Sequence, residues 1–313
     1  MSTRKILGFA VLSLCLLAVS ATAQPWVIYE LPKFTEPPEL DGVRGSDEWA
    51  NTLHDVCSPS RVRELNAQFG WIDEADEKGV MGYNQLLPSN IGAPGPDEDE
   101  SEAGTDADMT DNNWWGWDED GLYYLHEVRD NVRDIEDGGN ALAWWERDAV
   151  AIYLDMLNIR DNGPQWNVLI YLATDQASDS RSTQYLYHDG GSHTYAQEGE
   201  AVEGFEYGFR DAGSEFGGDA DYVIEGTMPW ESLMRWNLPD APTAGSVMAA
   251  AFIVPDPDGN DGLGGQMQCW GWADDASNWV ELVYTDTPAG PGSSAPTAAE
   301  EDSWGRIKAT FSQ

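Results

Sequence analysis

Residues 111–155 read DNNWWGWDEDGLYYLHEVRDNVRDIEDGGNALAWWERDAVAIYLD, and this stretch decides the fold. Apolar runs at 114–117 and 122–128 flank the turn-forming residues Asp118-Glu119-Asp120-Gly121, which predicts a β-hairpin. The run at 149–155 alternates apolar and mixed positions, as a strand with one apolar face does. We therefore expect these residues to form the centre of an all-β protein.

The rest of the chain contains further short apolar runs that are separated by turn-forming residues. They lie at 26–30, 165–173, 182–187, 201–209, 221–228, 246–254, 267–273 and 305–311. With only a few short helical turns between them, they predict an antiparallel β-sandwich of two sheets, of jelly-roll or immunoglobulin-like architecture. The acidic segment 57–112 is interpreted as an irregular insertion, and 286–299 as a surface loop.

The N-terminus has the pattern of a secretory signal peptide over residues 1–23. Arg4 and Lys5 precede an apolar run, and small residues end the segment at Ala21-Thr22-Ala23. The apolar run is too short for a membrane span, and no later segment predicts one. We expect residues 24–313 to form one exported domain, secreted, periplasmic or at the cell surface.

The charge of the chain limits its partners. The formal net charge is −40 for 313 residues, and loss of Arg4 and Lys5 with the signal peptide takes it to −42. Nucleic acids and anionic membranes require the opposite sign, so both are excluded as partners. A neutral ligand is favoured.

Cleavage of the signal peptide leaves two cysteines, Cys57 and Cys269. In an oxidising compartment they can form a disulfide, or they can remain two separate buried thiols. The sequence leaves both alternatives open because it lacks the geometry that decides between them.

One loop suggests a metal. Asp256, Asp258 and Asn260 place oxygen atoms at alternate positions, which suits calcium. The loop lacks the glycine and glutamate of an EF-hand, so an acidic turn is the alternative, and no cofactor is otherwise indicated.

Several groups of residues occur in an order that resembles the family-9 carbohydrate-binding modules and the related DOMON-like sugar-binding domains. The likeness spans roughly residues 36–311 and rests on these groups: Pro38-Glu39-Leu40-Asp41-Gly42 with Asp47-Glu48-Trp49; Trp117 to Tyr123 with Glu127-Val128-Arg129-Asp130; Trp145 to Val150 with Tyr153-Leu154-Asp155; Tyr222-Val223-Ile224-Glu225 with Pro229-Trp230; and Trp304-Gly305-Arg306-Ile307.

The resemblance implies an antiparallel β-sandwich that holds a sugar between two tryptophans. By motif position these are Trp145 and Trp279, and Asn278 lies near a polar contact position. Asn167 stands where the family has a sugar-contacting arginine, and Ala151 where it has a glutamate. The polar contacts must therefore differ from those of the family. The alternative for each tryptophan is a place in the core.

Three functions remain open. The first is a non-catalytic protein that binds a polysaccharide or oligosaccharide, alongside separate glycoside hydrolases. The second is a glycoside hydrolase or an accessory part of one, which would need a pair of carboxyl groups at a set separation. The third is a structural cell-surface sandwich without a ligand.

Overall fold

The computed structural model describes residues 26–45, 47–69, 105–133, 148–160, 168–174, 184–186, 204–235, 238–256, 265–268, 270–271 and 276–293. The described residues contain twelve strands: β1 (Ile28–Phe34), β2 (Leu53–Cys57), β3 (Thr110–Trp117), β4 (Gly121–Arg129), β5 (Ala149–Asp155), β6 (Val168–Thr174), β7 (Gln184–Leu186), β8 (Glu206–Gly213), β9 (Asp221–Pro229), β10 (Val247–Asp256), β11 (Gly265–Met267) and β12 (Val280–Ala289). Short helices α1 (Pro59–Phe69), α2 (Trp230–Met234) and η4 (Ala276–Asn278) complete them.

The predicted hairpin is β3 and β4, in register from Thr110↔Arg129 to Trp117↔Leu122. Its turn is closed by Asp118, whose Oδ1 accepts hydrogen bonds from the N–H groups of Asp120 and Gly121 at 2.8 and 3.0 Å. A short carboxylate side chain at the first position of a turn is well placed to accept from the residues that follow. The sequence at 118–121 therefore determines where the hairpin reverses.

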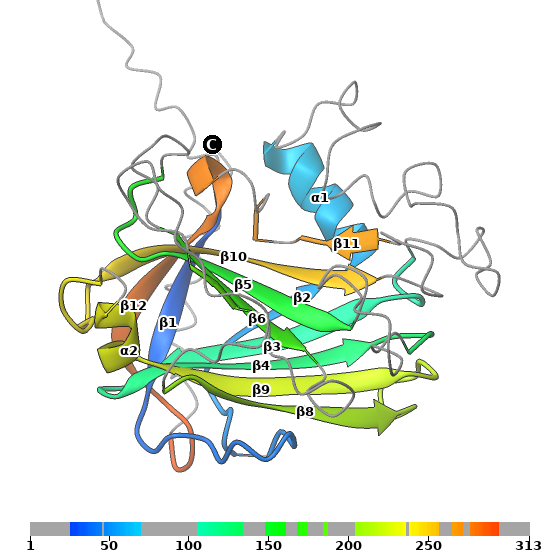
Figure 1. Ribbon diagram of the computed structural model, residues 1–313, viewed down its shortest axis with the longest axis horizontal. Coiled ribbons are helices and arrows are strands. Elements are labelled where there is room, and N and C mark those ends of the chain that lie inside the picture. The colour runs from blue at the N-terminus through cyan, green and yellow to red at the C-terminus, as the bar shows by residue number, and fades with distance from the viewer. Residues whose placement is uncertain are drawn as a thin grey trace, which may run out of the picture.

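The strands form a single hydrogen-bonded sheet in the order β7-β6-β5-β10-β12-β1-β3-β4-β9-β8, with β11 beside β10 and β2 beside β3 (Figure 1). The all-β prediction is confirmed. The purely antiparallel pairing is not, because β1 pairs in parallel with both β12 and β3. Parallel neighbours cannot be joined by a tight turn, and here β1 comes from the start of the chain and β12 from the end.

The sheet curls so that its two halves face each other across one core. Phe252 of β10 packs against Trp115 of β3 and His126 of β4, with ring centroids 6.4 and 5.1 Å apart. The hydroxyl of Tyr222 in β9 donates to the carbonyl of Ala149 in β5 at 3.4 Å. The molecule is thus sandwich-like, although the two predicted sheets are joined through β12, β1 and β3.

The segment predicted to be irregular, 57–112, contains the helix α1, which corrects that part of the prediction. Ser58 precedes Pro59 and accepts a hydrogen bond from the N–H of Arg61 at 3.3 Å, which is the geometry of an N-cap. Val62 and Leu65 are buried in the main core. The acidic composition of the whole segment concealed this short amphipathic run.

Several predicted segments differ in extent from the described strands or lie outside the described residues. Strand β12 extends to Ala289 and so enters the predicted loop 286–299. The strand predicted at 267–273 is described as β11, which ends at Met267. The closing run 305–311 and the signal peptide lie outside the described residues. Among the described helices, none has the length and apolar character that crossing a bilayer requires.

Candidate functional site

The predicted sugar slot is only partly covered by the described residues. Trp145 and Asn167 lie outside them. Trp279 lies at the start of β12 and is 0% exposed, with its ring edge-on to Tyr153 at a centroid distance of 5.8 Å. In this structure Trp279 is a core residue, not the open stacking face that the motif position predicted. Tyr153 of β5 is itself buried and packs against the Trp279 ring, which explains why that ring is not open to solvent.

Asn278, the predicted polar contact, is also buried. It lies in η4, directly beside Gly271, whose backbone has φ of +99°. A Cβ at residue 271 would lie 2.6 Å from the Asn278 carbonyl oxygen and 2.7 Å from its Oδ1. Only glycine fits this approach. In the structure Asn278 therefore packs closely against the backbone at Gly271.

All seven residues of β5 are buried, including Ala151. Since neighbouring side chains of a strand point to opposite faces, both faces of the sheet are covered at this strand. The prediction that one face of 149–155 is apolar and the other mixed understated how deeply the strand lies.

The calcium hypothesis stays a prediction. Asp256 is the last residue of β10, and Asp258 and Asn260 lie outside the described residues. Within the described ranges, no group of three or more histidine, cysteine, aspartate or glutamate side chains is arranged to hold a metal ion.

Cys57 ends β2 and is disulfide-bonded. Cys269 lies outside the described residues, so its pairing with Cys57 also stays a prediction. One described contact supports it, because the indole N–H of Trp270 donates to Asp55 Oδ2 at 2.9 Å. Residue 270 is therefore held close to β2.

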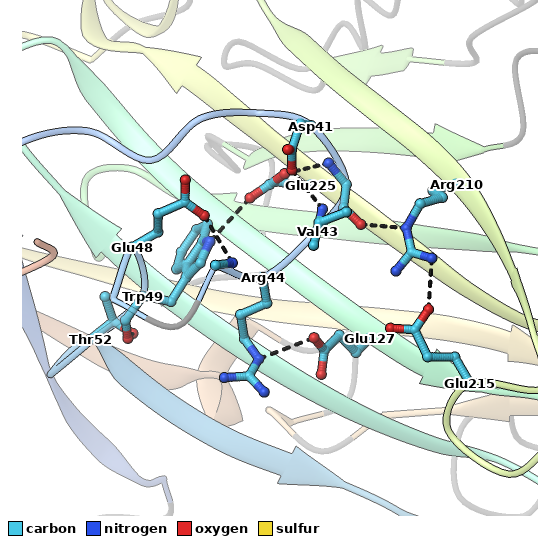
Figure 2. A network of polar contacts seen from close by, with 12 residues as sticks. Asp41, Val43, Arg44, Glu48, Trp49, Thr52, Glu127, Arg210, Glu215 and Glu225 are labelled. Atoms are coloured by element: carbon cyan, nitrogen blue, oxygen red, sulfur yellow. Dashed lines mark hydrogen bonds and ion pairs between the residues drawn. The ribbon is translucent and has the colours of Figure 1, made fainter.

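The first group of residues in the family resemblance, 38–42 with 47–49, is held in place by a network of polar contacts around Glu225 (Figure 2). Glu225 of β9 is 0% exposed and accepts hydrogen bonds from the N–H of Gly42 at 2.8 Å and from Trp49 Nε1 at 3.0 Å. Burial raises the pKa of Glu225 to about 7, although these two hydrogen bonds oppose the shift. The carboxylate fastens the segment 36–50 across the sheet.

Two arginines extend this network towards solvent (Figure 2). Arg210 donates through Nε to the Gly42 carbonyl at 2.5 Å and through Nη1 to Glu215 at 2.8 Å. Arg44 donates to Glu127 at 3.0 Å and lies over the Trp114 ring at 4.5 Å. Beneath them is a second apolar cluster, formed by Phe34, Trp49, Trp114, Tyr123, Leu125, Val223 and Ala289. We name the polar contacts of Glu225, Arg210 and Arg44 the Glu225 network. These contacts hold the loop around Gly42 in place.

A buried polar chain lies inside the sandwich. His126 Nδ1 is 3.0 Å from Asp111 Oδ2, Asn113 donates to the same oxygen at 3.0 Å, and the Trp115 indole donates to Asn113 at 3.0 Å. An aspartate beside a histidine is a feature of many catalytic sites. Here both side chains are 0% exposed, and the His126 ring packs edge-on against Trp115 and Phe252 in the core. The pair is therefore structural in this arrangement.

The second arginine–tryptophan contact lies where β5 ends and where β1 and β12 begin. The guanidinium of Arg160 lies 3.9 Å from the centroid of the Trp26 ring, and its Nη1 donates to the Trp279 carbonyl at 2.8 Å. Its Nη2 is 3.6 Å from Glu281 Oε2, which is too long for a hydrogen bond. We name Arg160, Trp26 and Glu281 the Arg160 cluster. Sequence reasoning missed it because the three residues are isolated from one another in the chain.

Comparisons with known proteins place the chain. The model of the family described as "Carbohydrate family 9 binding domain-like" matches residues 98–288, more than half of the chain. Among curated proteins, none matches this chain in sequence.

Two solved structures that resemble it are family-9 carbohydrate-binding modules from Caldicellulosiruptor kristjanssonii. One, in complex with cellotriose, has 14% identity and a TM-score of 0.48, covering 86% of this chain and 99% of the module. The other, in complex with glucose, has 14% identity and a TM-score of 0.44, covering 86% and 100%. Both TM-scores are below 0.5, so the assignment rests on the family match, which confirms the resemblance found in the sequence: the chain belongs to the carbohydrate family 9 binding domain-like family.

Proposed function

We propose that this protein binds a neutral polysaccharide or oligosaccharide outside the cytoplasm. The observation that carries the proposal is the family match over residues 98–288. The charge supports it, because a chain with a formal net charge of −40 repels polyanions but not uncharged glycans. The solved relatives in complex with cellotriose and glucose suggest the first ligands to test.

The chemistry of the ligand favours an aromatic contact through Trp145. A pyranose ring presents faces of C–H groups and a rim of hydroxyls, so an indole ring packs on the face while polar groups satisfy the rim. We assign the stacking face to Trp145 alone, since Trp279 is buried. Export through the predicted signal peptide, and action beside separate glycoside hydrolases in polysaccharide breakdown, complete the proposal.

Calorimetric titration with cellotriose and xylotriose tests the proposal. We expect Trp145→Ala to weaken binding by about tenfold, which corresponds to about 1.4 kcal/mol. Trp144→Ala is the matched control, because the sequence predicts that a strand begins after this tryptophan pair, and adjacent side chains of a strand point to opposite faces. Absence of binding by the wild-type protein to any neutral saccharide would reject the function. Release of reducing sugar from polysaccharides would instead support a hydrolase.

One observation favours a second candidate, a structural sandwich without a ligand. The buried Trp279 and the buried Ala151 stand at two positions that the resemblance assigns to sugar contacts. A sandwich that has lost its sugar site would show this pattern. The same titration separates the candidates, since the structural one predicts no saccharide binding.

A further inference from the structure

Arg160 is held in an unusual backbone conformation. Its φ is +55°, in the left-handed region that residues with a side chain rarely adopt. The turn after β5 supports it, because Asp155 accepts hydrogen bonds from the N–H groups of Leu157 at 3.3 Å and of Arg160 at 2.7 Å. Such strain persists only where the surroundings enforce it, and it is frequent at ligand sites.

The side chain of Arg160 is fixed as firmly as its backbone. Nε donates to Asn158 Oδ1 at 2.7 Å and Nη1 to the Trp279 carbonyl at 2.8 Å, while the guanidinium stacks on Trp26. Only 10% of the side chain is exposed. A guanidinium with three defined contacts loses little conformational entropy when it binds a ligand.

Two donors of the cluster are nevertheless unused. Arg160 Nη2 and Trp26 Nε1 are buried and have no hydrogen-bond partner within the part of the chain that the structure describes. Buried donors without partners are rare in proteins and call for an explanation. Glu281 Oε2, 3.6 Å from Nη2, offers an acceptor in the same place.

The charges of the cluster select against an anion. The carboxylates of Glu281 and Asp155 both act electrostatically on the positive charge of Arg160, so a further negative group would be repelled. A sugar hydroxyl both accepts and donates a hydrogen bond, and two neighbouring hydroxyls can therefore satisfy two donors and one acceptor. Trp26 as a whole residue is half-buried.

We propose that Arg160, Trp26 and Glu281 form a polar subsite that binds neighbouring hydroxyl groups of a neutral saccharide. This inference rests on the proposed function and names polar groups for binding a saccharide, which Ala151 cannot supply. The subsite lies beside the Asn278-Trp279 segment, to which Arg160 is hydrogen-bonded.

Calorimetric titration of the full chain with cellotriose and with xylotriose tests the subsite. Arg160→Gly removes the guanidinium while suiting the left-handed backbone, and Trp26→Phe removes the indole N–H while keeping a ring. We expect Arg160→Gly to weaken binding of the better ligand by about tenfold or more, and Trp26→Phe by about threefold to tenfold. Arg44→Gln is the matched control and should bind within about twofold of wild type. Thermal unfolding verifies that each variant is folded.

The outcomes separate the two proposals. Wild-type binding that Arg160→Gly and Trp26→Phe leave unchanged overturns the subsite and leaves the function standing. No wild-type binding to either saccharide overturns both. If Arg160→Gly fails to fold, a crystal structure of the wild-type cellotriose complex decides: sugar hydroxyls on Nη2 and Nε1 support the subsite, and water molecules there with the sugar elsewhere overturn it.

Discussion

Two arginines of this chain stack on tryptophans beside a glutamate, yet their surroundings differ. Arg44 lies 4.5 Å from the Trp114 centroid and donates to Glu127 at 3.0 Å, with 41% of its side chain exposed. Arg160 lies 3.9 Å from the Trp26 centroid, but its Nη2 stays 3.6 Å from Glu281, with only 10% of the side chain exposed.

This difference separates a structural contact, the Glu225 network, from a candidate binding site, the Arg160 cluster. In the Glu225 network the buried carboxylate has donors on both oxygens, and water reaches the arginines at its edge. In the Arg160 cluster the arginine is shielded from solvent, and two buried donors lack a partner in the described structure. Similar residues therefore stabilise a loop in the Glu225 network, whereas in the Arg160 cluster they leave hydrogen-bond donors unused.

We expect the largest loss of stability from a substitution that disrupts the Glu225 network. Glu225→Ala leaves the N–H of Gly42 and the indole N–H of Trp49 unpaired in the interior, so the free energy of unfolding should fall by about 2–4 kcal/mol. Urea denaturation followed by tryptophan fluorescence measures it. Glu215→Ala, at the exposed edge of the same network, is the control and should cost less than about 1 kcal/mol. Equal losses would show that the network is not organised around Glu225.

The pKa of Glu225 provides a second test of the same region. Because its pKa is raised in the folded state from 4.5 to about 7, the folded protein binds a proton that the unfolded chain does not bind between these values. The contribution of this group to stability therefore rises as pH falls from about 7 and is complete below about 4.5.

Unfolding of wild type and Glu225→Gln at a series of pH values measures this contribution. The difference in unfolding free energy should shift in favour of wild type by about 1–3 kcal/mol as pH falls from 8 to 5. Subtracting the variant removes the effect of the other carboxylates. Parallel pH curves would contradict the raised pKa.

Matched substitutions of the two arginines sharpen the comparison directly. Arg160→Gln loses the hydrogen bond to the Trp279 carbonyl and the stack on Trp26, and should lower the unfolding free energy by about 1–3 kcal/mol. Arg44→Gln breaks an ion pair that solvent reaches, and should lower it by less than about 1 kcal/mol. Guanidinium denaturation compares the two. A larger loss at Arg44 would reverse the roles that we assign.

The smallest effect concerns salt. A double-mutant cycle on Arg44 and Glu127 should give a coupling free energy of about 0.5 kcal/mol that falls in 1 M NaCl, because the Arg44 side chain is 41% exposed and its charge is screened, while Glu127 is 13% exposed. The cycle on Arg160 and Glu281 should change less with salt, since only 10% and 17% of these side chains are exposed. Equal salt dependence would mean that solvent reaches both pairs alike.

Much of the fold could be predicted from the sequence. The turn at 118–121 and the alternation at 149–155 are local patterns, and the strands they predict are β3, β4 and β5. The parallel partner of β1 could not be predicted, because β12 lies some two hundred and fifty residues away and no local pattern reports a pairing of that kind. Helix α1 was hidden in an acidic segment whose average composition suggested a loop.

The candidate site was less accessible to such reasoning. The motif position of Trp279 predicts a stacking face, but whether a ring is open or buried depends on what packs over it, here Tyr153. Arg160 and Asn158 are two left-handed positions in one turn that belongs to no motif. The partners of Arg160, Trp26 and Glu281, come from both ends of the domain. Residues that only tertiary contacts bring together, as here, show no characteristic spacing in the sequence.

The central claim is that this acidic chain binds an uncharged saccharide. The most direct measurement is binding of the intact protein to a glycan array that carries neutral gluco- and xylo-oligosaccharides beside oligouronates of matched length. Our account predicts retention on the neutral glycans and none on the oligouronates. Binding to the oligouronates alone, or to no glycan, would contradict it.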